Sequence, residues 1–140
     1  MERRSFLQNA AALGASAALM GSCSSAATST SSNSALESGK ILHTVYFWLK
    51  EGITEEEEQE FLQFFEVLKK LPGISAFHAG KPAPTTNRDV VDNSFQYSIF
   101  VLFNSMEEID VYEKHPDHLA AAEKFSKFWT KVEVRDSQMV

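Results

Sequence analysis

The chain has 140 residues, enough for one domain, and its hydrophobic fraction of 44% is ample for a core. Its net charge is −6 at pH 7 and it has no block of Lys and Arg, which argues against nucleic acid or anionic lipid as the main partner. Cys23 is the only cysteine, so a disulfide within the chain and thiol chemistry in the domain are excluded.

The amino-terminal part of the sequence is typical of an export signal. The apolar run from Ala10 to Met20 is shorter than the ~20 residues that a permanent membrane helix needs, and it has no polar face that would suit a helix of the domain. Arg3 and Arg4, followed by a Phe-Leu pair, resemble a twin-arginine signal. We therefore predict a signal peptide over residues 1–23 and export to the periplasm or cell envelope.

The residues around Cys23 leave two outcomes open. The five residues that end at Cys23 resemble a bacterial lipobox, in which the cysteine is lipidated and becomes the first residue of the mature protein. The alternative is ordinary cleavage just after it, with Cys23 discarded. Residues 24–39 are polar and without periodicity, which predicts a flexible Ser/Thr-rich linker. A folded domain over residues 40–140 follows, with a lipid at Cys23 as its only expected link to a membrane.

The domain begins with a predicted strand over residues 40–50. Its side chains are β-branched or aromatic, and both of its faces are largely apolar. One face carries His43 with Val45, and the other carries Tyr46 and Trp48.

A helix is predicted after this strand. Thr54 and Glu57 have the spacing of a capping box, in which a hydroxyl and a carboxylate satisfy amide groups at a helix start. Apolar residues then recur on one face, at Phe61, Phe64, Phe65, Leu68 and Leu71. The four glutamates at the helix start complement the helix dipole, and we expect no metal site there.

Two further strands are predicted over residues 74–79 and 95–103. The segment between them, residues 81–93, lacks periodicity and is longer than most strand connections. It would either cover a pocket or form a solvated connection without a role.

Helical patterns return after the third strand. Ser105 and Glu108 have the spacing of a second capping box and predict a short helix that carries Tyr112. Pro116 suits the first turn of a following helix, where its missing N–H costs nothing. Alternation of the apolar residues near the carboxyl end then predicts a last strand that includes Asp136.

The spacing of the following helix separates the two histidines of the His-Pro-Asp-His segment. His118 begins an apolar stripe that continues through Ala122, Phe125 and Trp129, so its side chain is predicted to face inward. His115 lies in the junction between the two helices, where it can cap the second one.

The order strand, helix, strand, strand, helix pair, strand predicts an α+β, ferredoxin-like split βαβ subunit. Such a subunit has a four-stranded antiparallel sheet with its helices on one face. The other face would carry uncovered apolar residues, namely Tyr46, Trp48, Phe100 and Leu102. Because burial of such a patch is worth roughly 25 cal/mol per Å², we expect a homodimer packed sheet to sheet.

Several short motifs of the domain occur together at familiar spacings. They are HTVYFWLK from His43, GITE from Gly52, LPGI from Leu71, FNS from Phe103 and YEKHPDH from Tyr112. Together they resemble the stress-responsive dimeric α/β-barrel (Dabb) family. The resemblance implies a ferredoxin-like subunit that pairs with a partner's sheet as a dimeric α/β barrel, with a cavity between sheet and helices. In members that act as polyketide cyclases two histidines line that cavity, and the matching positions here are His43 and His118.

The candidate site residues are therefore His118, His43, Tyr112 and Tyr97. A neutral imidazole could act as general base while a tyrosine hydroxyl polarises a carbonyl. Alternatively, both histidines are partly buried and satisfied by backbone and by each other.

Three functions stay open: an exported module that binds a small apolar or aromatic molecule, a cyclase or lyase acting on a carbonyl (polyketide-like) compound, and a haem-associated protein that a Soret band would reveal. The sequence has no zinc-ligand spacing, phosphate loop or nucleophile arrangement, so we expect no cofactor and no metal site.

Overall fold

A computed structural model of the chain describes residues 36–140. Its elements are β1 (Ile41–Leu49), α1 (Glu55–Leu68), β2 (Ala76–Gly80), β3 (Tyr97–Phe103), α2 (Met106–Lys114), α3 (Pro116–Phe125), the short 3₁₀ helix η2 (Ser126–Phe128) and β4 (Trp129–Gln138). The predicted signal peptide, Cys23 and most of the predicted linker lie outside the described residues. Within the part that is described, no helix has the length and apolar character needed to cross a membrane.

The last residues of the predicted linker are already structured. The Gly39 N–H donates to the Met139 carbonyl oxygen at 2.9 Å, and the Met139 N–H donates to the Lys40 carbonyl oxygen at 2.8 Å. These bonds join the chain just before β1 to the end of β4, so Gly39, which composition assigned to the linker, takes part in the hydrogen bonding of the fold.

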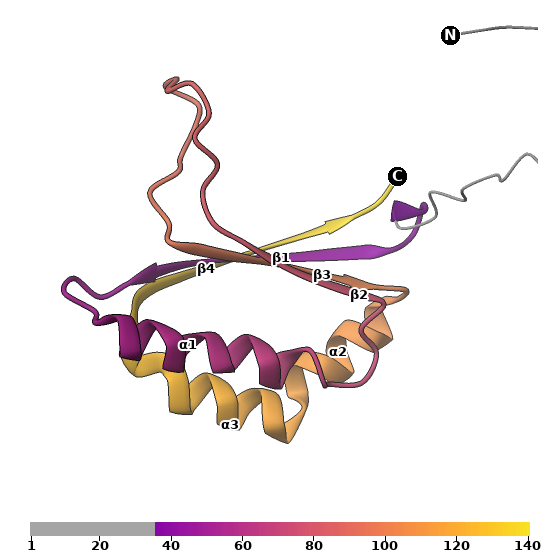
Figure 1. Ribbon diagram of the computed structural model, residues 1–140. Coiled ribbons are helices and arrows are strands. Elements are labelled where there is room, and N and C mark those ends of the chain that lie inside the picture. Colours follow the sequence, from indigo (N-terminus) through magenta and orange to yellow (C-terminus); the bar gives the residue numbers. More distant parts are fainter. Residues whose placement is uncertain (1–35) are drawn as a thin grey trace, which may run out of the picture. The chain divides into compact units, whose positions relative to one another are not determined.

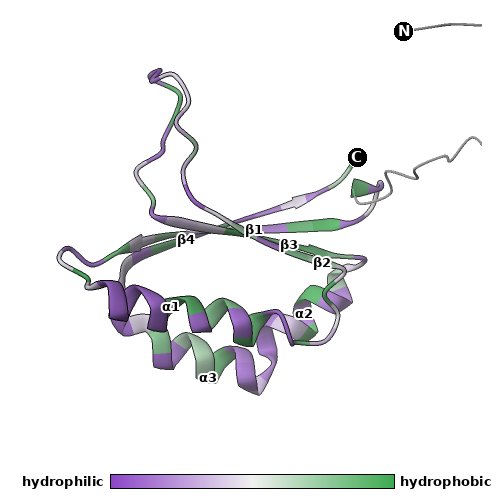
Figure 2. Ribbon diagram, viewed as in Figure 1, coloured by the Kyte–Doolittle hydropathy of each residue, from purple (hydrophilic) through white to green (hydrophobic). Residues whose placement is uncertain are grey.

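The strands form one antiparallel sheet in the order β2-β3-β1-β4. Helices α1, α2 and α3 all lie against the same face of this sheet (Figure 1). This arrangement confirms the predicted ferredoxin-like α+β fold. Figure 2 shows β1 as largely hydrophobic, whereas α1 is hydrophilic at its start and then carries both hydrophobic and hydrophilic residues, as expected for a helix with one buried face.

The core lies between the sheet and the helices. The Phe47 ring of β1 contacts the apolar stripe of α1, with centroid distances of 5.6 Å to Phe61, 6.0 Å to Phe64 and 5.6 Å to Phe65. Phe61, Phe64, Phe65 and Leu68 are all buried, which confirms the predicted stripe. Aromatic rings therefore supply much of the buried area, in the tilted and edge-to-face arrangements that such rings prefer.

The start of α1 has the predicted capping box. The Thr54 hydroxyl accepts from the Glu57 N–H at 3.2 Å, and the Glu57 carboxylate accepts from the Thr54 N–H at 3.0 Å. We expect Thr54→Ala to lower the free energy of unfolding by about 1 kcal/mol, because the amide groups at the helix start lose their partner. Urea denaturation measures this, with Thr54→Ser as the control that keeps the hydroxyl; equal stability of both variants would contradict the expectation.

Two helix boundaries differ from the sequence-based expectation. The Ser105 hydroxyl caps α2 as predicted, but the Glu108 carboxylate accepts from the Asn104 N–H at 2.7 Å, one residue before the cap, so the reciprocal box is incomplete. Helix α3 ends at Phe125, and Trp129 is extended and begins β4. Pairing of Trp129 with Leu49 of β1 takes it out of the helix that its spacing suggested.

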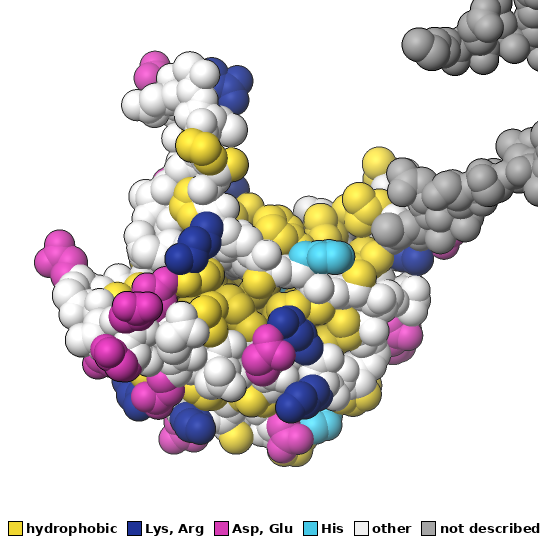
Figure 3. All heavy atoms as spheres, viewed as in Figure 1, with side chains coloured by type: hydrophobic (Ala, Val, Ile, Leu, Met, Phe, Trp, Pro, Cys, Tyr) yellow, Lys and Arg dark blue, Asp and Glu magenta, His cyan; other side chains and the backbone are white. Residues whose placement is uncertain are grey.

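The sheet face opposite the helices is apolar on one half. Phe100 is 36% exposed there, and Figure 3 shows hydrophobic side chains on this side of the sheet, beside a raised loop. Leu102 also lies on this face but is only 5% exposed, so the prediction that it is uncovered was wrong. Leu102 lies between Leu42 of β1 and Ala76 of β2, its partners in the sheet, and it lines one pocket with Leu36 and Phe100.

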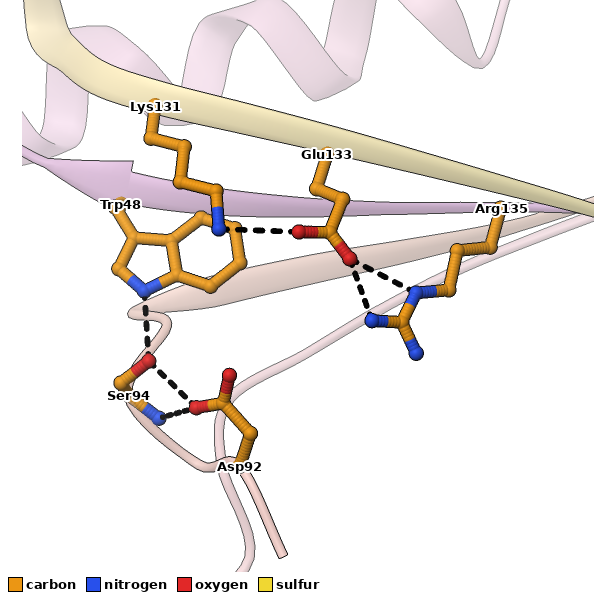
Figure 4. Close-up of polar contacts among 6 residues, drawn as sticks. All are labelled: Trp48, Asp92, Ser94, Lys131, Glu133 and Arg135. Carbon is orange, nitrogen blue, oxygen red and sulfur yellow. Dashed lines mark hydrogen bonds and ion pairs between the residues drawn. The ribbon is translucent and has the colours of Figure 1, made fainter.

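The other half of this face is polar, because β4 carries charged residues there. The ammonium group of Lys131 lies 4.0 Å from the centre of the Trp48 ring, and Glu133 pairs with Lys131 at 3.0 Å (Figure 4). The Trp48 indole N–H donates to the Ser94 hydroxyl at 2.9 Å, which ties the sheet to the end of the loop between β2 and β3. That loop rises on the side away from the helices, so it does not cover the space between sheet and helices (Figure 1).

Candidate functional site

A cavity of about 400 Å³ lies between the sheet and the helices. Most of its wall is apolar. Side chains from β1, α1, β3, α2, α3 and β4 line it, among them His43, Phe47, Phe64, Tyr112, His118, Ala122, Trp129, Val132 and Val134. This volume and this apolar character are typical of sites that take small organic ligands.

Three of the predicted site residues meet at this cavity. His43 faces it from β1 and is 5% exposed, and Tyr112 of α2 is fully buried between the two histidines, with ring centroids 5.9 Å from His43 and 4.6 Å from His118. His115 ends α2 and caps α3, since its Nδ1 accepts from the Asp117 N–H at 3.2 Å. Because α3 begins at this cap, its first turn directs His118 toward the cavity, as the helical spacing predicted.

Asp136 holds His43, an interaction that sequence reasoning missed. The two residues are opposite each other in the β1–β4 register, and His43 Nδ1 lies 2.6 Å from Asp136 Oδ1. In this hydrogen bond Nδ1–H donates to the carboxylate, and the bond orients the imidazole ring. Alternation with Val132 and Val134 was the available signal, but the register that pairs Asp136 with His43 is not readable from sequence.

Two buried polar atoms at the cavity have no hydrogen-bond partner among the described residues: the Tyr112 hydroxyl and His118 Nδ1. Burial, assisted by Glu113, raises the pKa of Tyr112 above its usual range, so the hydroxyl stays protonated and can donate. Burial first, and then the proximity of His43 and His115, lower the pKa of His118. The cavity therefore offers a ligand one hydroxyl donor, from Tyr112, and one neutral imidazole, from His118.

Tyr97 does not belong to this group. In the β1–β3 register it pairs with Phe47, whereas His43 lies four residues away along β1, roughly 13 Å at the rise of a strand. Its ring packs 5.5 Å from Phe61, and its hydroxyl donates to the Glu58 carboxylate. The structure therefore assigns Tyr97 a packing and hydrogen-bonding role at the other end of the core.

The lowered pKa of His118 predicts a pH dependence of stability. An unfolded histidine takes up its proton below about pH 6.5, before the folded one does, so protonation favours unfolding. We expect the free energy of unfolding to be at its full value above about pH 6.5 and to fall as the pH drops through the lower pKa of the folded state. Urea denaturation at a series of pH values measures the slope.

His118→Asn should flatten this slope, and the same change at the exposed His78 should leave it intact. An unchanged slope in His118→Asn would assign the effect to another group.

Comparison with known proteins places the site in a family context. The family described as Stress responsive A/B Barrel Domain matches residues 41–139. Olivetolic acid cyclase from Cannabis sativa is 25% identical over 97 residues, a match that covers 69% of this chain and 93% of the relative.

Solved structures share the fold. A dabb family protein with a ferredoxin-like fold from Mesorhizobium loti is 24% identical, with a TM-score of 0.61 over 73% of this chain and 98% of that one. A dimeric protein of ferredoxin-like fold from Bacteroides fragilis is 21% identical, with a TM-score of 0.56 over 72% and 97% of the two chains.

Proposed function

This chain belongs to the stress responsive A/B barrel domain family, and we propose that it holds one small apolar or aromatic molecule in the cavity between its sheet and its helices. One observation carries the proposal: the Tyr112 hydroxyl and His118 Nδ1 are buried without partners at an apolar cavity. Leaving such groups unpaired costs about 1–3 kcal/mol each, and a bound molecule with suitable polar atoms would recover that cost.

The two groups specify the polar part of this molecule. The protonated Tyr112 hydroxyl can donate to a carbonyl oxygen, and a neutral His118 can share a hydrogen bond with a second polar group. The aromatic wall formed by Phe47, Phe64 and Trp129 suits the apolar remainder of the molecule. An aromatic carbonyl compound meets both requirements.

Mass spectrometry of small molecules released from the protein, purified from its native cells, tests this proposal. The expected result is one compound of this class, recovered in proportion to the protein and lost when a bulky side chain is built into the cavity by Ala122→Phe. Equal recovery from the wild type and from Ala122→Phe would contradict the cavity as its site.

A second candidate function is proton transfer on a carbonyl compound, as in a cyclase or lyase. The observation that favours it is the pairing of an unpartnered, neutral His118 with a hydroxyl donor at Tyr112, ring centroids 4.6 Å apart. His118 would take a proton from the carbon beside the carbonyl while Tyr112 donates to the carbonyl oxygen. The similarity to olivetolic acid cyclase supports this candidate. The haem-associated alternative stays a prediction.

His118→Ala separates the binder from the enzyme. The enzyme candidate predicts that the purified chain consumes the recovered compound, and that His118→Ala abolishes consumption even when the variant is saturated with the compound. If the compound binds but neither the wild type nor His118→Ala consumes it, the binding function stands and the catalytic function is contradicted.

We also propose that the chain forms a homodimer through the sheet face opposite the helices, with Tyr46, Trp48 and Phe100 at the contact. Exposure of Phe100 on that face supports this, as does the description of the Bacteroides fragilis protein as dimeric. Light scattering should give a dimer that Phe100→Glu converts to a monomer. A stable wild-type monomer at micromolar concentration would contradict the proposal.

For the amino-terminal part we propose export through the twin-arginine-type signal, with Cys23 either lipidated or removed. The paired arginines and the lipobox-like residues support this. Replacement of Arg3 and Arg4 by lysine should retain the precursor inside the cell, and the mass of the mature protein should report whether Cys23 carries a lipid. Unchanged export would contradict the signal assignment.

A further inference from the structure

His43, Glu113 and Asp136 bring one donor atom each to a common point. They belong to three different elements, β1, α2 and β4, and the donor atoms all lie within 4.8 Å of one another. His43 is buried, and both carboxylates are exposed. The three residues are far apart in the chain, so no short spacing of ligand residues indicated them. From the sequence we expected no metal site in the domain.

The donor set suits a divalent transition-metal ion. Zinc binds histidine nitrogen and carboxylate oxygen at about 2.0–2.2 Å, so donors around one ion lie up to about 4 Å apart. The donor atoms are at present up to 4.8 Å apart, so binding of an ion requires the exposed Glu113 carboxylate to move toward the other two donors. The close contact of His43 Nδ1 with Asp136, at 2.6 Å, now holds a proton that a metal ion would displace.

The surroundings add a second observation, an unpartnered polar group in the adjoining cavity. Tyr112, next to Glu113 in the chain and 5.9 Å from the His43 ring, is fully buried, lines the same cavity and leaves its hydroxyl without a partner. Glu113 and His43 line this cavity as well. Metal sites with three protein ligands keep a further position open for water or a bound molecule.

We propose that His43, Glu113 and Asp136 form a three-ligand site for a zinc-class divalent ion at the edge of the cavity. Magnesium and calcium are disfavoured, because they prefer all-oxygen coordination whereas imidazole suits zinc, cobalt and their neighbours. The site goes beyond the proposed ligand binding and is independent of it, since the metal can be titrated with no organic molecule present.

The test is titration of the full chain, stripped with chelator, with Zn²⁺ by calorimetry and with Co²⁺ by visible absorption. Every sample carries Cys23→Ser so that no thiol competes for the metal. We expect saturation at one ion per chain, with Co²⁺ bands of a nitrogen and oxygen site. Asp136→Asn and Glu113→Gln should each weaken Zn²⁺ binding at least about tenfold. Glu113 is exposed and without a role in the core, so its variant stays informative if Asp136→Asn unfolds.

Asp117→Asn is the matched control, because it removes a carboxylate 3.9 Å from the other histidine of the helix junction, His115. It should leave the affinity unchanged. Absence of saturable Zn²⁺ binding up to millimolar concentration, or equal weakening by Asp117→Asn and Asp136→Asn, would overturn the proposal. If metal-free protein still releases the small molecule, the proposed ligand-binding function stands, whether or not the metal proposal holds.

Discussion

Tyr112→Phe is expected to raise the free energy of unfolding by about 1 kcal/mol and to weaken the binding of an aromatic carbonyl compound about tenfold. The hydroxyl is buried without a hydrogen-bond partner, so no hydrogen bond in the folded state offsets the cost of removing it from water. Phenylalanine removes that cost and keeps the ring, which packs against Phe103 at 5.1 Å and against His118 at 4.6 Å. The same change removes the donor that we assign to the ligand carbonyl.

Tyr97→Phe is the matched control for this result. Its hydroxyl donates to the Glu58 carboxylate, so its removal should lower the free energy of unfolding by about 1 kcal/mol and leave ligand binding unchanged. The pair of variants makes the same chemical change with opposite expected signs. Urea denaturation without ligand, and calorimetric titration with acetophenone, measure the two effects. Destabilisation by Tyr112→Phe together with unchanged affinity would contradict the assignment of its hydroxyl to a ligand.

Phe61→Ala is expected to lower the free energy of unfolding by about 3–5 kcal/mol. Phe61 is fully buried, and its ring contacts Phe47, Phe65 and Trp129 at 5.6, 5.1 and 6.1 Å. Its removal therefore opens a void at the centre of the aromatic core, which rigid neighbours on both the sheet and the helix cannot fill. Domains of this size have only about 5–15 kcal/mol in total, so the variant should unfold at low urea concentration.

Leu119→Ala provides the comparison for Phe61→Ala. Leu119 is 57% exposed on α3, and its truncation should change the free energy of unfolding by less than about 0.5 kcal/mol. Chemical denaturation of both variants measures the difference. Similar stability of Phe61→Ala and Leu119→Ala would mean that Phe61 is not a central core residue.

Much of the fold could be predicted because it depends on local periodicity. The spacing of Phe61, Phe64, Phe65 and Leu68 identified the buried face of α1, and the Thr54 capping box identified its start. The helical phase of His118 likewise predicted which histidine of the junction faces the cavity. These features need only neighbours within a few residues, which a single sequence shows directly.

What could not be predicted depends on pairing between strands. The register of β1 with β4 brings Asp136 to His43, and the register of β1 with β3 takes Tyr97 away from it. Leu102 has the alternation of an uncovered residue, yet it is buried between its sheet partners Leu42 and Ala76. Alternation gives the face of a residue, but neither its partner across the sheet nor what covers it.

The central claim is that the cavity between sheet and helices, and not the opposite sheet face, takes an aromatic carbonyl ligand. The chain has two tryptophans, with Trp129 in the cavity wall and Trp48 on the opposite face, so their indole N–H signals in a proton–nitrogen NMR spectrum report the two places separately. On titration with acetophenone, a saturable shift of the Trp129 signal is expected in the wild type and in Ala120→Phe, whose substitution lies outside the cavity, and its loss is expected in Ala122→Phe. A saturable shift confined to Trp48, or a Trp129 shift that survives in Ala122→Phe, would contradict the account.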